Sequence, residues 1–315
     1  MNLSKKEKLL LFILLSAICH LPSVLTAATS QTGTTTASFL KIETGARPVG
    51  MGGAYVAVVD DINAVYWNPA GLVQLQSREF SFIHTAWLEK IHHETVSFAA
   101  PGNQRFAYGL SVVFFGTTDI DRRTAAGIND GKAKVADYYE SVSLAWKLMD
   151  NTSIGATLKS IQMTLDNDKG SGYALDLGAL QKLPLNMSVG IMVQNLGPKM
   201  KAVDTSEKLP TNVKTGLAWR ALDNKLVLAG DIDLPNDREM KFHAGAEYQF
   251  NRLFALRAGY EDVGSLGNSS GMTAGISINE DMLDEILNVN MQFDYSWLYF
   301  GELGSTHRIG ISVKF

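Results

Sequence analysis

The sequence predicts an all-β protein, a transmembrane antiparallel β-barrel of about fourteen strands with an N-terminal plug segment inside its lumen. Three observations predict it. Apolar and polar residues alternate in segments from residue 79 onward, the gaps between segments alternate between long and short, and the chain ends on an aromatic residue, Phe315. Strands of bacterial barrels face lipid and lumen in turn, and an even strand count keeps both termini on one side. We therefore expect a Gram-negative-type outer membrane, with both termini in the periplasm.

Residues 1–27 have the pattern of a secretory signal peptide. Three lysines precede the apolar run Leu9 to Ile18, and small residues offer a cleavage site near Ala27 and Ala28. The run is too short to span a bilayer. Cys19 is the only cysteine of the chain and lies in this segment. The mature protein should therefore contain no disulfide, no thiol nucleophile and no cysteine-based metal site.

Residues 28–78, the second expected region, lack strand patterns and are dense in glycine and aromatic residues. Gly50, Gly52 and Gly53 could form a phosphate-binding loop, but no strand and helix surround them and no lysine follows. Glycines also let one stretch of backbone pack closely on another. This property suits a segment that folds inside a barrel lumen.

Residues 79–315, the third region, should form the barrel. Val142, Leu144 and Trp146, for example, alternate with Ser141 and Ser143. A β-sandwich would alternate in the same way, so periodicity alone does not distinguish the two folds. The expected strands are residues 79–88, 92–100, 105–115, 137–148, 153–164, 173–183, 186–195, 211–221, 225–234, 239–250, 253–261, 271–278, 287–298 and 305–315.

The lengths of the connections favour the barrel. Long gaps are expected at 116–136, 165–172, 196–210 and 262–270, and short ones between them. Membrane barrels have short periplasmic turns and longer outer loops, whereas a sandwich has no reason to alternate them. Two connections depart from the rule: the first hairpin loop is short, and the turn at 279–286 is long. A helical turn near Asp281 to Leu287 could fill the second.

Composition excludes some classes of function. The formal net charge is −4, which argues against nucleic-acid binding. Hydrophobic residues make up 46% of the chain, and no segment after the signal peptide approaches the about 18 apolar residues of a membrane helix.

The closing strand should carry the barrel assembly signal. Ile311, Val313 and Phe315 fall on one face of the last strand and should face lipid. Arg308 and Lys314 fall on the other face and should point into the lumen.

Charged residues of both signs fall on the expected inward faces of the strands. An isolated charge in a narrow barrel is costly, so we expect a paired network that braces the barrel and holds the plug. The expected members are Asp176, Lys214, Arg220, Asp231, Asp233, Lys241, Glu247, Arg257, Asp294 and Arg308. Any apolar pocket should come from the outer loops and the plug, with Phe114, Phe115 and Met163 as candidates. Gly109 marks either a bulge or lateral opening, or a place where a neighbouring aromatic side chain needs room.

The stretch Phe39 to Leu72 resembles the N-terminal hatch of the FadL superfamily of outer-membrane proteins. The matching hatch residues are Gly45, Arg47, Gly50, Gly52, Gly53, Asn68, Pro69 and Ala70. More closely, the whole mature chain resembles the PorV/PorQ family. Further matching pieces are Ala64 to Leu72, Leu175 to Ala179, Val193 to Pro198, Leu209 to Asn212 and Ala246 to Tyr248. The resemblance implies a fourteen-stranded barrel with an N-terminal hatch.

The resemblance implies two functions of different classes. One is passive passage or binding of hydrophobic small molecules. The other is a PorV-like role in type IX protein secretion, in which the protein receives exported cargo. The expected partners are outer-membrane lipid, the barrel assembly machinery, and a hydrophobic small molecule, secretion-system proteins or exported cargo, but no nucleic acid.

The sequence gives little support for an enzyme, a cofactor or a metal site. Asp231 and Asp233 share one strand face, so acid–base chemistry is conceivable, although structural roles are favoured. His84 and His92 lie on opposite sides of a loop tip, next to His93, and show no paired acid in the sequence pattern. We therefore expect no metal there.

Overall fold

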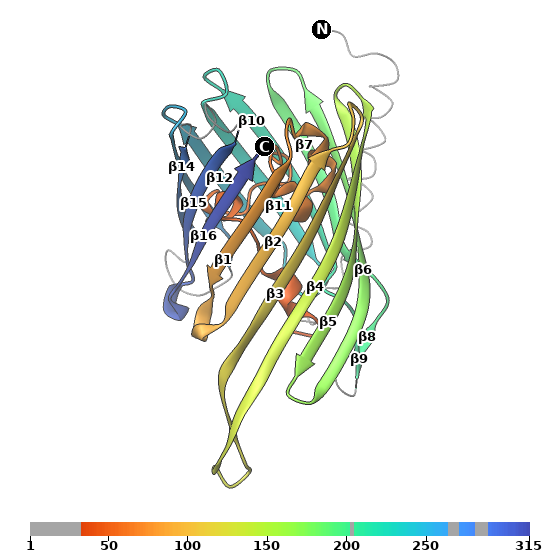
Figure 1. Cartoon of the computed structure of the whole chain (residues 1–315), viewed down its shortest axis with the longest axis vertical. Helices are drawn as coiled ribbons and strands as arrows, with labels where there is room; N and C mark the ends of the chain where they lie inside the picture. Colours follow the sequence, from red (N-terminus) through yellow and green to blue (C-terminus); the bar gives the residue numbers. More distant parts are fainter. Residues whose placement is uncertain (1–32, 202–204, 264–270, 281–288) are drawn as a thin grey trace.

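The computed structural model describes residues 33–201, 205–263, 271–280 and 289–315. Fourteen antiparallel strands form a closed barrel, which confirms the predicted fold class (Figure 1). The expected signal peptide, 1–27, and the expected helical turn near Asp281 to Leu287 lie outside the described residues.

Each of the fourteen predicted segments overlaps one barrel strand. Neighbours in sequence are neighbours in the barrel, β7 pairs with β10, and β1 pairs with β16 to close it. The strands are β1 (Glu79–Ala86), β2 (His92–Pro101), β3 (Phe106–Arg123), β4 (Asn129–Met149), β5 (Thr152–Leu165), β6 (Asp168–Leu183), β7 (Met187–Leu196), β10 (Asn212–Ala221), β11 (Leu226–Pro235), β12 (Lys241–Gln249), β13 (Phe254–Glu261), β14 (Met272–Glu280), β15 (Asn290–Tyr299) and β16 (Ser305–Lys314).

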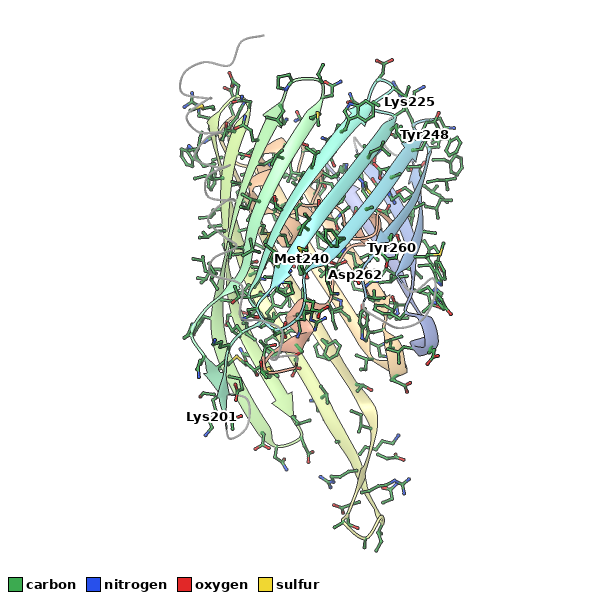
Figure 2. All side chains as sticks on the ribbon, turned by 180° about the vertical axis from the view of Figure 1, so that it is seen from behind. Lys201, Lys225, Met240, Tyr248, Tyr260 and Asp262 are labelled. Carbon is green, nitrogen blue, oxygen red and sulfur yellow. The ribbon has the colours of Figure 1, made fainter. Side chains whose placement is uncertain are left out.

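The alternation of the sequence becomes an apolar outer face and a buried inner face. Leu144 and Trp146 are about half exposed on the outside, at 49% and 50%, whereas Ser143 and Ala145 are buried inside, at 0% and 2%. Tyr248 and Tyr260 also project from the outer face (Figure 2). This arrangement is that of a barrel in lipid, where apolar side chains stay outside because the solvent there is hydrocarbon.

The expected long loop at 116–136 is wrong. β3 and β4 continue as a paired hairpin to Arg123 and from Asn129, and this hairpin protrudes far beyond one end of the barrel (Figure 1). Residues 120–132 are exposed on both faces. Water therefore bathes both faces, which removes the apolar alternation by which a strand is recognised.

Two other expected loops also contain strands. The gap at 165–172 shrinks to a short turn, because β5 continues to Leu165 and β6 already begins at Asp168. The gap at 196–210 contains a two-stranded hairpin, β8 (Met200–Lys201) and β9 (Ser206–Glu207). We call the end of the barrel with the β3–β4 hairpin the hairpin end, and the end with the C-terminus the terminal end.

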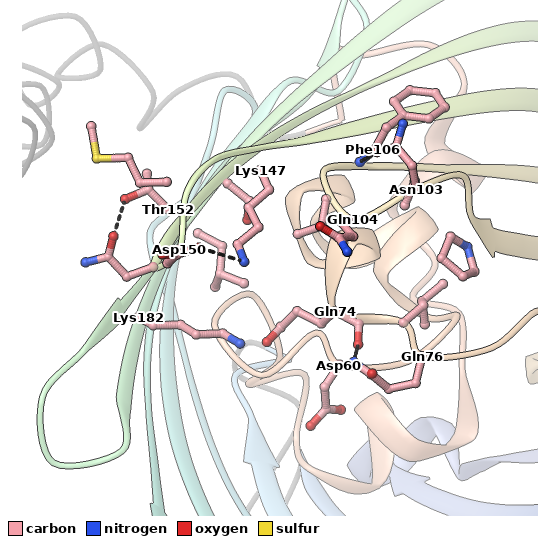
Figure 3. A pocket seen from close by; sticks show the side chains of 18 residues that line it. Asp60, Gln74, Gln76, Asn103, Gln104, Phe106, Lys147, Asp150, Thr152 and Lys182 are labelled. Atoms are coloured by element: carbon pink, nitrogen blue, oxygen red, sulfur yellow. Dashed lines mark hydrogen bonds and ion pairs between the residues drawn. The ribbon is translucent and has the colours of Figure 1, made fainter.

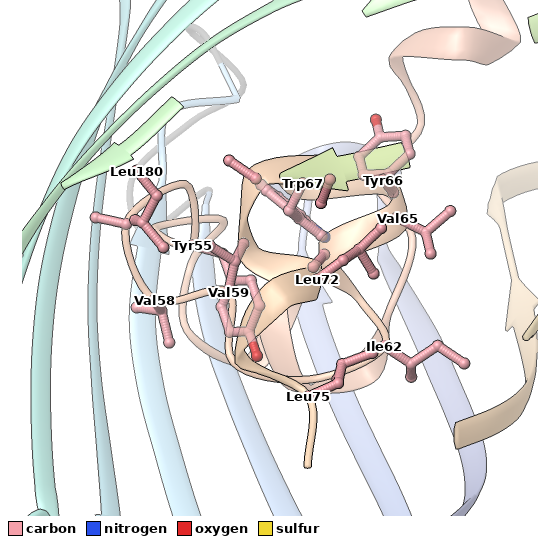
Figure 4. Close-up of a cluster of buried hydrophobic side chains, with 14 of the residues drawn as sticks. Tyr55, Val58, Val59, Ile62, Val65, Tyr66, Trp67, Leu72, Leu75 and Leu180 are labelled. Carbon is pink, nitrogen blue, oxygen red and sulfur yellow. The ribbon is translucent and has the colours of Figure 1, made fainter. Parts of the chain in front are cut away.

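Residues 33–78, which we call the internal segment, lie inside the barrel as short helices (Figures 1 and 4). These are η2 (Ser38–Lys41), α3 (Ala46–Gly50), α4 (Ala64–Trp67) and η3 (Pro69–Gln74); η4 (Leu88–Lys90) and η5 (Gly301–Leu303) lie in strand connections. Tyr55, Trp67 and Leu72 are fully buried at the centre of the cluster. Within the described residues, no helix has the length and apolar character needed to cross a bilayer.

The closing strand is fixed by backbone pairing at the terminal end. Phe315 donates to and accepts from the Arg78 backbone at 3.0 and 3.1 Å, just before β1 begins. Phe315 is 46% exposed, while Arg308 is buried inside the barrel. Lys314 lies 3.6 Å from the Glu79 carboxylate.

Candidate functional site

Arg47 connects the internal segment to the barrel wall. Its guanidinium contacts Asp60 at 2.6 Å and Asp61 at 2.9 Å within the segment, and makes two bonds of 2.7 and 2.8 Å to Glu247 of β12. The planar fork of arginine suits such paired recognition of a carboxylate. Glu247 also accepts from Arg257 of β13 at 2.6 Å.

The same chain of charges continues around the wall. Arg257 pairs with Asp294 of β15 at 2.9 Å. On the opposite side, Arg220 of β10 reaches Asp60 at 3.0 Å and the Val58 carbonyl at 2.8 Å. Burial alone would raise the pKa of the Asp60 carboxyl, but the Arg47 and Arg220 guanidiniums hold it below its usual value.

A second cluster surrounds Lys214 of β10. Its ammonium lies 2.9 Å from Asp233, 3.3 Å from Glu43 of the internal segment, and 4.6 Å from the centre of the Trp67 ring. His243 of β12 donates from Nδ1 to the Gly52 carbonyl at 2.9 Å, and its Nε2 lies 3.7 Å from Asp233. Because the Lys214 ammonium lies between two carboxylates, this buried group is organised as an ion-pair cluster.

Asp231 and Asp176 bind backbone. The Asp231 carboxylate accepts from the Tyr55 and Val56 amides at 2.7 and 2.8 Å, which fixes a turn of the internal segment. Asp176 accepts from the Asn195 amide at 2.7 Å and pairs with Lys159 at 2.7 Å. Both amides bind Oδ2 of Asp231, and Asp233 on the same strand face is paired with Lys214, so the two carboxylates serve in structural contacts.

Two further predicted members lie near the hairpin end. Arg308 is buried beside the Glu43 carbonyl, at 3.4 Å, and the Thr306 hydroxyl, at 3.0 Å. Lys241 is opposite Asp233 in the β11–β12 register and is half-buried at the rim of a small cavity.

The glycines of the hatch motif let the internal segment approach the wall. Gly52 has φ +66°, and a Cβ there would lie 2.5 Å from the Tyr260 amide nitrogen. Gly259 faces it from β13, with a Cβ position 2.4 Å from the Gly52 nitrogen. Gly45 and Gly53 also have positive φ, and Gly50 lies against Gly275 of β14. The phosphate-loop alternative fails here because the space around Gly52 is filled by the wall.

Asn68, Pro69 and Ala70 make the turn into η3. The buried Asn68 amide donates to the Val56 carbonyl at 3.0 Å and to the Ala179 carbonyl of β6 at 3.1 Å, and its oxygen accepts from the Ala70 amide at 3.2 Å. Pro69 occupies the first position of the helix, where no amide hydrogen is needed. The motif therefore ties two parts of the internal segment to the wall.

Cavities lie on both sides of the internal segment. Two polar cavities of about 620 and 470 Å³ open at the terminal end, and Asp60 lines both. Figure 3 shows the larger one, with Lys147, Lys182 and Gln74 around it. Towards the hairpin end lies a charged cavity of only about 60 Å³. Between them, the core around Trp67 fills the lumen (Figure 4).

An apolar cluster, which we call the Phe39 cluster, lies inside the barrel at the hairpin end. Phe39 of the internal segment has its ring centre 6.2 Å from those of Phe115 and Tyr139. Its other members are Ala37, Leu40, Ile42, Val113, Ile161, Ala174, Met200 and Leu209, with Trp87 and Met163 packed against them. Phe114, expected beside Phe115, instead faces outward and is 41% exposed, because successive side chains of a strand point to opposite faces.

The barrel wall carries only small side chains at three neighbouring serines. Ser97, Ser111 and Ser141 of β2, β3 and β4 line a cavity of about 10 Å³ inside the barrel and an apolar hollow of about 430 Å³ on its outer face. At that level only strand backbone and small side chains separate the two. Of the two alternatives for Gly109, the bulge is excluded, because the ladder is regular there. The glycine leaves room for a neighbouring side chain, but this is the aliphatic Val65 of the internal segment and not an aromatic one.

The three histidines near the first hairpin lie on different faces of the barrel wall. His93 is buried and faces inward, while His84 and His92 lie on the outer face. The expectation that His84 has no paired acid is wrong, because the β1–β2 register places Glu94 opposite it, with Nδ1 and Oε1 2.7 Å apart.

Sequence reasoning missed several charged residues of the lumen. These are Glu43, Asp60, Asp61, Glu79, Lys159, His243 and Glu261. Lys159 was detectable, since it shares the inward parity of β5 with Thr157 and Ile161. The residues of the internal segment carried no such signal, because that segment has no regular periodicity.

Comparison with known proteins agrees with the fold. A model of the uncharacterised protein family UPF0164 matches residues 17–172. Two UPF0164 proteins of Treponema pallidum (strain Nichols) are 26% and 25% identical over 202 and 180 residues, which cover 57% and 52% of this chain. The matches cover 47% and 44% of those proteins, so the chain spans about half the length of these curated relatives.

Solved structures resemble nearly the whole barrel. The toluene transporter TbuX of Ralstonia pickettii has a TM-score of 0.60 at 15% identity, over 86% of this chain and 97% of its own. The toluene transporter TodX of Pseudomonas putida gives 0.59 at 14%, over 86% and 96%. A FadL homologue of Pseudomonas aeruginosa gives 0.58 at 12%, over 86% and 98%. Identities this low speak for the fold alone, and the PorV/PorQ resemblance stays a prediction. The chain therefore has the FadL-like barrel fold.

Proposed function

We propose that this protein is an outer-membrane barrel that binds hydrophobic small molecules and lets them pass passively across the outer membrane. The internal segment fills the middle of the lumen, which disfavours an open diffusion pore. The proteins of similar fold include toluene transporters, which makes small apolar molecules a reasonable first class of ligand.

The observation that carries the proposal is the Phe39 cluster. It is apolar, lies inside the barrel at the hairpin end, and is built jointly by the wall and the internal segment. A small shift of η2 would expose Phe115 and Tyr139 to an entering molecule. Aromatic rings and methionine side chains provide the adaptable apolar surface that such ligands need.

A route out of the lumen at Ser97, Ser111 and Ser141 would require the β2–β3–β4 ladder, which is continuous there, to part locally. The inner cavity and the outer hollow share these residues, and Leu110, Val112 and Val142 make the outer hollow apolar. A lipophilic molecule that crosses here enters the hydrocarbon layer and avoids the charged cavities at the terminal end.

The proposal places the terminal end in the periplasm. The connections at this end are mostly short, whereas the β3–β4 hairpin extends from the other. In this orientation the Phe39 cluster is near the cell exterior. The closing residues Ile311, Val313 and Phe315 are then on the outer face near the periplasmic interface, where the barrel assembly machinery would receive them.

Binding of a lipophile by the purified protein tests the proposal. The protein in detergent is mixed with toluene, decanoate and oleate separately, and binding is measured by calorimetry and native mass spectrometry. Phe115→Ala should weaken binding several-fold, since it removes an aromatic contact worth about 1 kcal/mol. Phe114→Ala, its outward-facing neighbour, should bind as the parent does. Absence of binding to every lipophile, or equal effects of the two variants, would contradict the proposal.

A second hypothesis is a PorV-like role in type IX secretion. The protruding β3–β4 hairpin favours it, because an arm that extends well beyond the barrel can contact another protein. Deletion of the gene should then trap proteins with a type IX sorting domain in the periplasm. An unchanged set of secreted proteins would exclude this role and leave the transport proposal intact.

A further inference from the structure

A group of three potential metal ligands lies on the outer face of the barrel, on the opposite side of the sheet from the lumen charges. His84 of β1 and His92 and Glu94 of β2 each offer one ligand atom, and these atoms lie within 4.8 Å of one another. The strand register explains the grouping. Glu94 pairs directly with His84, and His92 precedes it by two residues, so the three side chains share a face.

The distances fit a single small ion. A tetrahedral zinc with bonds of about 2.1 Å separates its ligand atoms by about 3.4 Å. The His84 Nδ1 to Glu94 Oε1 distance of 2.7 Å is below this value, and the largest separation in the group is no more than 4.8 Å. Small rotations of these side chains, two of which are partly buried, are therefore enough to seat an ion, with no movement of the strands.

The environment of Glu94 also favours a ligand. Its Oε2 is shielded from solvent and has no hydrogen-bond partner in the part of the chain that the structure describes. The rings of His84 and His92 lie 5.8 Å apart between centres, and His92 is exposed. His92 is the first residue of β2, beside the connection at the hairpin end, so the group lies at the rim of the barrel, where an ion can approach from solution. One carboxylate oxygen is left to bind a cation.

We propose that His84, His92 and Glu94 form a binding site for a divalent transition metal of the zinc class. Two imidazoles and one carboxylate are ligands that zinc accepts, with a fourth position open to water or to an anionic group. The lumen group Glu43, Asp233 and His243 has similar residue types but already holds the Lys214 ammonium, so it is not the favoured site.

Zinc titration of the detergent-purified mature protein, without a histidine tag, tests the site. We expect one equivalent of Zn²⁺ per chain. His84→Ala and His92→Ala should each weaken the zinc affinity by at least about tenfold. Substitution of the residues that merely orient metal ligands already lowers metal affinity by about tenfold or more. Glu94→Gln should act in the same direction. His307→Ala, an outward histidine stacked on Tyr295, should retain the parental affinity.

Proton competition gives a second readout. Binding requires neutral imidazoles, so affinity should fall as the pH is lowered. Circular dichroism and heat-dependent migration in SDS gels show that each variant keeps its barrel. The site is excluded if the folded parent binds no Zn²⁺ up to millimolar concentration, or if folded His92→Ala binds it as tightly as the parent.

Discussion

Replacement of Arg47 by alanine tests how the internal segment is held. Arg47 contacts Asp60, Asp61 and Glu247 at 2.6 to 2.9 Å, and its side chain is only 13% exposed. Its loss leaves three carboxylates without their shared cation. We therefore expect the internal segment to open more often while the barrel itself stays folded.

The size of the effect follows from the contacts that remain. Breaking a buried ion pair by removing one partner costs about 3–5 kcal/mol. Glu247 keeps Arg257 and Asp60 keeps Arg220, and Asp60 is one-third exposed, so the lower end of the range applies. A loss of about 3 kcal/mol raises the open population roughly a hundredfold.

Thiol labelling measures the open population. Ala57→Cys places a thiol at a buried position of the internal segment, in a Cys19→Ser background. Arg47→Ala should raise the labelling rate about a hundredfold, and Arg105→Ala, at an exposed turn, should leave it unchanged. The reasoning is refuted if Arg47→Ala labels within threefold of the parent while both remain folded in heat-dependent gel migration.

Three further predictions concern packing, pH and assembly. Gly52→Ala should lower the stability by at least about 2 kcal/mol in thermal unfolding, because its Cβ would collide with the adjoining wall in addition to the strain of a positive φ. Gly33→Ala, with a φ of +79° but open space around it, should cost only the backbone strain. Burial alone would raise the pKa of Asp237, but the Lys41 and Thr35 hydrogen bonds hold it below its usual value of 3.8. This contact therefore stabilises the fold above about pH 4, and the stabilisation is lost as the pH falls through the lower pKa that Asp237 has in the folded protein. Protease should then cleave near Lys41 more readily in acid. No change in cleavage down to pH 2 would contradict this prediction. Deletion of Phe315 should reduce the amount of folded protein in the outer membrane several-fold, and normal insertion would exclude an assembly role.

The strands could be predicted because each one carries its own evidence. A strand between lipid and a polar lumen must alternate along its length, so positions such as Leu144 and Ser143 reveal their faces without any knowledge of their neighbours. The signal disappears wherever both faces meet water. The outer part of the β3–β4 hairpin therefore has the sequence pattern of a loop.

The charged residues of the lumen show where sequence reasoning stops. Parity placed Lys214 and Asp233 on inward faces, but nothing local indicates that Glu43, 171 residues away from Lys214, completes their cluster. Lys159 had the correct parity and was overlooked. On the outer face, the pairing of His84 with Glu94 depends on the register of one short hairpin, which the sequence pattern left open.

The sequence by itself determined the closed barrel, because solvent on the two sides of a membrane strand imposes a periodicity that any single segment displays. Only the tertiary structure decided which charges meet inside it, which glycine faces which backbone, and that Phe39 packs with Phe115 and Tyr139. These contacts join residues far apart in the chain, and their strength depends on distance and burial, which no local pattern encodes.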